Sequence, residues 1–165
     1  MQTFMPYNDF ARTAKSLDNK RLNKQALEAW QIMLTNLHLD PNNGHRPPRG
    51  WFNHPAAVMW RGHEQALLTY IEAMVEEWKG RGYKSTILDK ATNTFVFAIE
   101  NDLTMYEDDV IMPTWIENKL LLDKLTETHR LALLTKNYEW YSQFDWPEDH
   151  GFEPATYEYF WRGNN

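Results

Sequence analysis

The chain has 165 residues, 42% of them hydrophobic and 24% charged, which is the composition of one folded globular domain. It has no cysteine, and this excludes disulfides, thiolate nucleophiles and cysteine-ligated metal sites. There is no long apolar run and no basic leader, so we expect no membrane span, no secretion and a cytoplasmic location.

The net charge of −6 by itself argues against a nucleic-acid partner, but the charges are unevenly distributed. Residues 11–62 hold eight basic and three acidic side chains, a local balance of +5. Such asymmetry is typical of an anion-binding face on an acidic body, although solvated charges can also cluster by chance.

Helical periodicity dominates the chain. Apolar residues recur three or four positions apart between Leu17 and Leu37, which predicts a helix over about residues 16–38. The proline- and glycine-containing stretch 42–50 then interrupts the pattern. A second helix is expected from about Asn53 to Trp78, with glycines just beyond its end.

A third helical stretch is expected over about residues 85–100. The fourth begins at Pro113, where Thr114 and Glu117 have capping-box spacing, and runs to Leu134 with a break near residues 126–129. Beyond Lys136 the pattern gives way to an irregular tail rich in aromatic residues, Trp161 among them. We therefore predict an all-α fold: a compact helical bundle in which residues 1–165 form a single domain.

One face of the first long helix carries Arg21, Lys24 and Glu28 at positions i, i+3 and i+7. Two cations and a carboxylate on one helix face suit a phosphate-bearing substrate whose reaction also needs acid–base catalysis. The same spacing is typical of a solvated face with an intrahelical Lys24–Glu28 pair.

The histidines show no metal-binding signature, so we expect no metal and no cofactor. Around residues 51–63, rings and Arg61 could stack on bases and contact phosphate, although Trp51 and Trp60 could equally be core residues. No serine lies in a nucleophile motif. The nucleophile of an enzyme with this sequence would be water, a lysine or the amino terminus.

Five stretches in order along the chain resemble the pyrimidine-dimer DNA glycosylase family, typified by endonuclease V, and most closely its uncharacterised bacterial and phage members. They are residues 17–28 (LDNKRLNKQALE), 53–62 (NHPAAVMWRG), 78–83 (WKGRGY), 128–131 (THRL) and 137–141 (NYEWY). The resemblance implies a compact all-α fold and a role in base-excision DNA repair. It also implies cleavage of the glycosidic bond of a damaged pyrimidine, followed by lyase cleavage of the strand.

In that family the nucleophile is the N-terminal α-amine, which forms an imine with the sugar while a helix-borne glutamate assists. An α-amine has a reference pKa of about 7.7–8.0, so a useful fraction is neutral near pH 7. The resemblance assigns these catalytic roles to Met1 and Glu28; the bulky Gln2 disfavours removal of Met1. The arginine that precedes the family glutamate is Leu27 here.

The resemblance and the local chemistry together nominate nucleic-acid contacts at Arg21, Lys24, Asn53, His54, Arg61, His129, Arg130, Trp140 and Tyr141. We expect a monomer acting on double-stranded DNA with a damaged or modified base. Two other readings remain open: a non-catalytic module that binds nucleic acid or protein on the same fold, and an enzyme acting on a small nucleotide.

Overall fold

The computed structural model describes residues 1–154 and 157–160, so the predicted aromatic position Trp161 lies outside the described residues. Within that part of the chain the regular structure is helical, with one isolated β-bridge between Leu39 and His45. The α-helices are α1 (Phe10–Ser16), α2 (Asn19–Asn36), α3 (Pro55–Trp60), α4 (Glu64–Gly80), α5 (Ile87–Glu100), α6 (Thr114–Glu117), α7 (Lys119–Lys136) and α8 (Tyr138–Tyr141). The 3₁₀ turns are η1 (Gly50–Asn53), η2 (Ser142–Phe144) and η3 (Pro147–Asp149). The predicted all-α class and irregular aromatic tail are confirmed.

The first predicted helix is two helices that meet at an extended junction. Leu17 and Asp18 have β-region backbone angles, so the helical run predicted from residue 16 is interrupted there. Asp18 accepts a hydrogen bond from the backbone N–H of Arg21 and so begins α2 as its N-cap, and Asp9 does the same for α1. The apolar period passes through this junction, which is why periodicity alone missed it.

The second predicted helix is likewise split, at residues 61–63. Gly62 has a φ of +78°, a left-handed conformation that suits glycine and ends α3 before α4 begins. Pro55 occupies the first turn of α3, as predicted, and α4 ends at Gly80. The stretch predicted at 85–100 is α5.

The fourth predicted helix is broken at Asn118, not at residues 126–129. The Asn118 side chain accepts from the backbone N–H of Leu121 and caps α7, which then runs unbroken to Lys136. Thr114 is the first residue of α6 and makes no capping hydrogen bond, so the predicted capping box does not form. Thr126 instead bonds back to the Leu122 carbonyl inside the continuous helix.

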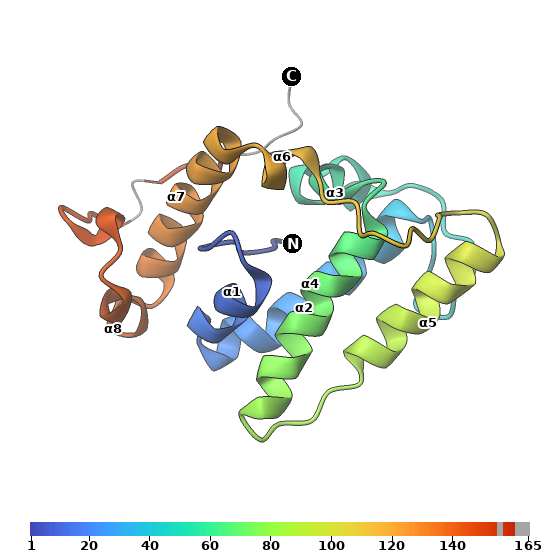
Figure 1. The fold of residues 1–165 in the computed structure, drawn as a ribbon, viewed down its shortest axis with the longest axis horizontal. Helices are drawn as coiled ribbons and strands as arrows, with labels where there is room; N and C mark the ends of the chain where they lie inside the picture. The colour runs from blue at the N-terminus through green and yellow to red at the C-terminus, as the bar shows by residue number, and fades with distance from the viewer. Residues whose placement is uncertain (155–156, 161–165) are drawn as a thin grey trace.

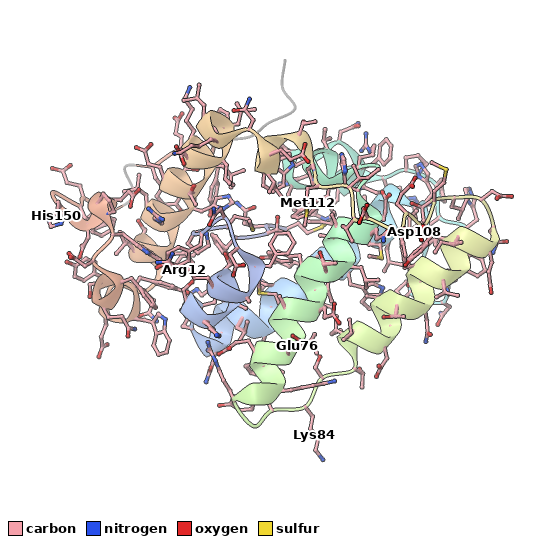
Figure 2. All side chains as sticks on the ribbon, viewed as in Figure 1. Arg12, Glu76, Lys84, Asp108, Met112 and His150 are labelled. Atoms are coloured by element: carbon pink, nitrogen blue, oxygen red, sulfur yellow. The ribbon has the colours of Figure 1, made fainter. Side chains whose placement is uncertain are left out.

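The helices surround the first residues of the chain (Figure 1). Helices α2, α4 and α5 pack side by side, α1 packs on α4, and α7 lies across the N-terminal segment from them. Figure 2 shows side chains filling the spaces between the ribbons, while Lys84 extends outward from the α4–α5 connection. Among the described residues, no helix is both long and apolar enough to cross a bilayer.

Candidate active site

Residues 2–6 are buried and belong to no helix or strand, so no regular pairing satisfies their backbone groups. Side chains from the surrounding helices supply partners instead. The backbone N–H groups of residues 2, 4 and 5 donate to Glu28 Oε2 (3.0 Å), Gln25 Oε1 (2.7 Å) and His129 Nδ1 (2.8 Å). Helices α2 and α7 thereby fix the amino terminus in the middle of the molecule.

Further bonds from α3 and α4 anchor the same segment. Trp60 Nε1 donates to the Thr3 hydroxyl oxygen over 2.8 Å, and both side chains are buried. The Tyr70 hydroxyl lies 2.9 Å from both the Phe4 carbonyl oxygen and Gln25 Oε1. Burial, with the negative charge of Glu28, raises the pKa of Tyr70 well above its usual value. Tyr70 therefore stays a neutral hydrogen-bond donor.

Glu28 faces the amino terminus rather than open solvent. Its side chain is 13% exposed, while that of Lys24, one turn earlier, is 67% exposed. Lys24 Nζ lies 3.4 Å from Glu28 Oε1, and the Gln2 N–H occupies the other carboxylate oxygen. The predicted Lys24–Glu28 pair therefore forms, but its carboxylate is mostly buried and also bonded to the Gln2 backbone.

His54 belongs to the same neighbourhood. It caps α3, because its Nδ1 accepts the Ala56 N–H over 3.2 Å. Burial lowers the pKa of His54, and the positive charge of the Met1 amino terminus lowers it further. The His54 ring also packs edge-on against Trp51, with 4.8 Å between centroids. His54 is thus a neutral imidazole near the chain end at neutral pH.

Two clefts meet at Met1 and Glu28, which line both of them. The first, of about 430 Å³, lies between the C-terminal half of α2 and the loop before η1, and Arg46, Arg49 and Trp51 line its loop side. The second, of about 380 Å³, lies along the start of α2. Its cationic lining residues are Lys20, Arg21, Lys24 and Lys136.

Among the residues that the structure describes, Glu28 is the one carboxylate that lines either cleft. The cleft beside α4 and the α5 C-terminus is different, because Glu64, Asp102 and Glu107 line it with Arg61. The basic excess of residues 11–62 is thus concentrated where the amino terminus and Glu28 meet. An anionic polymer would be attracted to these two clefts in spite of the negative net charge.

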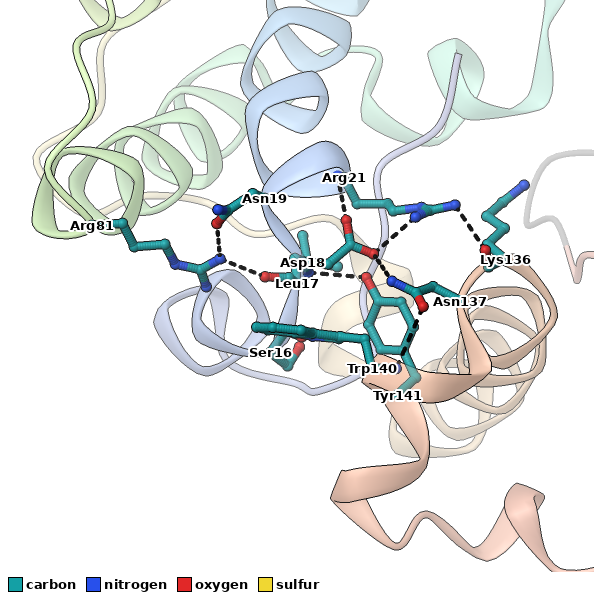
Figure 3. A network of polar contacts seen from close by, with 10 residues as sticks. All are labelled: Ser16, Leu17, Asp18, Asn19, Arg21, Arg81, Lys136, Asn137, Trp140 and Tyr141. Atoms are coloured by element: carbon teal, nitrogen blue, oxygen red, sulfur yellow. Dashed lines mark hydrogen bonds and ion pairs between the residues drawn. The ribbon is translucent and has the colours of Figure 1, made fainter.

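Three arginines predicted to contact phosphate are engaged in the fold. Arg21 pairs with Asp18 over 2.9 Å and donates to the Lys136 carbonyl, leaving its side chain 17% exposed (Figure 3). Arg130 donates to the Pro6 carbonyl over 2.8 Å and lies 3.5 Å from Glu148 Oε1. Arg61 stacks on Phe52, with 3.9 Å between its guanidinium carbon and the ring centroid. Of the three, Arg21 lines a cleft beside Glu28.

Two further predicted contacts lie in the core. His129 is 1% exposed, and burial lowers its pKa to about 3. Tyr141 is fully buried, and its hydroxyl accepts the Asp18 N–H over 3.1 Å. Because DNA cannot reach either ring, we correct these two assignments to structural roles.

The remaining predicted contacts are at the surface but apart from the clefts. Trp140 is partly exposed, and its indole N–H donates to the Ser16 carbonyl over 2.9 Å. Asn53 is exposed at the end of η1, and neither residue lines the clefts beside Glu28. No group of three or more potential metal ligands gathers within residues 1–154 and 157–160.

Sequence reasoning did not nominate several residues that line the site. Lys20 precedes Arg21, which it did nominate, and the others are Arg46, Arg49, Lys136 and Tyr159. Trp51, which the sequence left open as either a base-stacking ring or a core residue, lines the first cleft and is 51% exposed. The basic pair at 46 and 49 was visible in the sequence, but it lies in a loop with no periodicity that would indicate its direction. Lys136 and Tyr159 reach the site through tertiary packing alone.

A protein-family model described as pyrimidine dimer DNA glycosylase matches residues 1–91, which is more than half of the chain. This range includes the N-terminal segment, Glu28 and both arginines of the loop before η1. No curated protein and no solved structure matches the chain significantly.

Proposed function

The chain belongs to the pyrimidine dimer DNA glycosylase family, and from this membership we propose a DNA glycosylase with AP-lyase activity. Its substrate is double-stranded DNA that carries a damaged or modified pyrimidine. The Met1 α-amine is the nucleophile, Glu28 is the acid–base group, and the enzyme acts as a monomer in base excision.

One observation supports this proposal above all: the chain end and a carboxylate are held together where two cation-lined clefts meet. The 3.0 Å hydrogen bond from the Gln2 N–H to Glu28 places the α-amine one residue away from the carboxylate. Lys20, Lys24 and Lys136 on one side, and Arg46 and Arg49 on the other, supply positive charge for a DNA strand.

The reaction requires few groups. The amine lone pair forms a bond to C1′ of the deoxyribose while the glycosidic C–N bond breaks. The base leaves with the electron pair of the glycosidic bond and takes a proton from the solvent. Glu28 accepts a proton from the attached nitrogen and returns it to O4′ as the C1′–O4′ bond opens, which leaves a protonated C1′=N imine. Loss of a C2′ proton then expels the 3′-phosphate, and water hydrolyses the imine.

Borohydride trapping tests this chemistry, because reduction converts the imine into a stable covalent adduct between protein and DNA. We expect wild-type protein to be trapped on duplexes with an abasic site and on irradiated duplexes. Acetylation of the α-amine should abolish trapping without unfolding the protein. The matched control is Lys24→Arg, which removes the nearest lysine amine that Glu28 contacts and should leave trapping intact.

Other outcomes would redirect the assignment. Full trapping by the acetylated protein that disappears in Lys24→Arg would make a lysine the nucleophile. Binding to damaged duplex without any trapping would favour the non-catalytic binding module. Turnover of free nucleotides with no affinity for duplex would favour the small-nucleotide enzyme.

A further inference from the structure

The loop between α2 and η1 is fastened to the body of the protein. Leu39 and His45 form a β-bridge, and the Arg46 N–H donates to the His38 carbonyl over 2.7 Å. Asp40 Oδ1 accepts the N–H groups of Asn42 (2.7 Å) and Gly44 (2.9 Å). A Cβ at Gly44 would lie 2.6 Å from Asp40 Oδ2, so a larger residue there would displace the Asp40 side chain from this turn.

The far end of the loop is fixed by Phe52. Its ring packs on the His38 ring, at 4.9 Å between centroids, and the Arg61 guanidinium carbon lies 3.9 Å from its centroid. Arg61 also donates to the Phe52 carbonyl. Arg61 therefore holds the residue that follows Trp51 in the chain.

Residues 46–51 form one wall of the cleft that contains Met1 and Glu28. Arg46, Arg49 and Trp51 are exposed on this wall, and 51% of the Trp51 surface is accessible although its ring packs on His54. Neither Arg46 nor Arg49 has an ion-pair partner within the described residues, in contrast to Arg21 and Arg130. Pro47 and Pro48 stiffen the wall between the two cations.

This combination of groups fits a nucleotide that has left the duplex. Unpaired guanidinium groups bind phosphate, and an exposed indole stacks on a base of any sequence. A cleft of about 430 Å³ is within the size range of sites for small organic ligands, so it has room for a single nucleoside beside the amine.

We propose, in an inference that rests on the proposed function, that residues 46–51 are the base-receiving wall of the active site. Trp51 stacks on a nucleobase extruded from the duplex, and Arg46 and Arg49 bind the phosphates beside that nucleotide. The substrate class is thus DNA whose target nucleotide is unpaired or easily unpaired.

The test compares binding to two duplexes that differ only in one pyrimidine, paired in the first and unpaired as a single-nucleotide bulge in the second. Extrusion costs least for an unpaired base, so wild-type protein should prefer the bulged duplex. Trp51→Ala should weaken binding to the bulged duplex by roughly 5- to 150-fold, the fold-change that corresponds to losing one base–aromatic stack, and should leave binding to the paired duplex nearly unchanged. Trp51→Phe should keep most of the preference.

The arginines should behave differently, because phosphate contacts carry no information about pairing. Arg46→Ala with Arg49→Ala should weaken binding to both duplexes and reduce the log–log salt slope by about 1.8, or about 0.9 for each lost phosphate contact. The controls are Tyr106→Ala, an exposed ring outside the cleft, and Lys84→Ala with Lys90→Ala, an equal change in charge away from it. Tyr106→Ala should leave the preference for the bulged duplex unchanged, and the double lysine variant should leave the affinity for both duplexes and the salt slope unchanged.

An unchanged preference in Trp51→Ala and Trp51→Phe, with thermal unfolding like that of the wild type, would overturn the base-receiving wall. A lost preference in Trp51→Ala that Trp51→Phe restores would support it, even if the alanine variant is less stable. Borohydride trapping of wild-type protein is measured in parallel. If the wild-type protein is trapped but its preference for the bulged duplex does not depend on Trp51, only the base-receiving wall is refuted. If the preference depends on Trp51 but no protein is trapped, only the imine chemistry is refuted.

Discussion

The backbone N–H of Gln2 and the carboxylate of Glu28 are joined by a 3.0 Å hydrogen bond between residues 26 positions apart. This bond sets the distance between the α-amine and its candidate proton carrier. It also occupies one carboxylate oxygen, while Lys24 stands 3.4 Å from the other. Glu28 therefore has a positioning role in addition to its proposed acid–base role.

Glu28→Gln separates these two roles, because glutamine keeps an oxygen that can accept the Gln2 N–H but cannot carry the proton. We expect DNA affinity to be retained or to increase, since a negative charge near phosphate is removed. Single-turnover cleavage should slow by about 10²–10⁴, the usual contribution of a positioned proton-transfer group. Affinity and cleavage are measured on the same sample, with the exposed Glu127→Gln as control. Cleavage at the wild-type rate would remove Glu28 from the mechanism.

The salt dependence of DNA binding tests the second cleft. Lys20 and Lys136 line it and are exposed, so phosphate contact by each would release counterions. Lys20→Ala and Lys136→Ala should each reduce the log–log salt slope by about 0.9, whereas Lys84→Ala should leave it unchanged. Titrations from low to physiological salt give the slopes. Identical slopes in all four proteins would place the strand elsewhere.

His129 should make the fold sensitive to mild acid. Its Nδ1 accepts the Met5 N–H, and Nε2 has no hydrogen-bond partner within the described residues. Because burial lowers its pKa from 6.5 to about 3, the unfolded chain binds a proton in this interval that the folded protein does not. The free energy of unfolding should therefore fall as the pH drops below about 6.5.

The expected loss from this residue at pH 5 is about 2 kcal/mol relative to neutral pH, at 1.36 kcal/mol per pH unit. In His129→Asn an amide oxygen can accept the Met5 N–H but does not titrate. This variant should be less stable at pH 7, and its stability should vary less between pH 7 and 5. Denaturant unfolding at both pH values measures the difference. Equal pH dependence in the two proteins would contradict a buried neutral imidazole.

Asp18 should contribute more to the free energy of unfolding than an ordinary N-cap residue does. Figure 3 shows the junction of α1 and α2 held between two distant helix ends, because Arg81 donates to the Leu17 carbonyl and Asn137 donates to Asp18 Oδ2. Burial by itself raises the pKa of Asp18, but the hydrogen bonds and charge of Arg21 outweigh it, so the net pKa lies below its usual value.

Asp18→Ala removes the cap and leaves the Arg21 guanidinium without its carboxylate, so we expect a loss of about 2–3 kcal/mol. Asp9→Ala is the matched control, because Asp9 caps α1 at an exposed position and should cost only about 1 kcal/mol. Chemical denaturation compares the two variants. Equal losses would mean that the Asp18 network adds nothing beyond an ordinary cap.

The sequence by itself determined the all-α class and the approximate positions of the main helices. Apolar periodicity is a local property of the sequence, and a helix with such a pattern is stabilised when its apolar face is buried. It also placed Lys24 and Glu28 on one face of the same helix, where the structure has them. It did not determine the helix breaks at residues 17–18 and 61–63, where one cap and one left-handed glycine interrupt a continuing apolar period.

Only the tertiary structure decided which cations are available to a ligand. In the sequence, Arg21, Arg61 and Arg130 are indistinguishable from Arg46 and Arg49, because whether an arginine has a partner depends on groups up to 124 positions away. Packing also buried His129 and Tyr141, and it brought the first residues of the chain against Glu28. A side chain's partners are set by how distant helices meet, and no local pattern encodes that meeting.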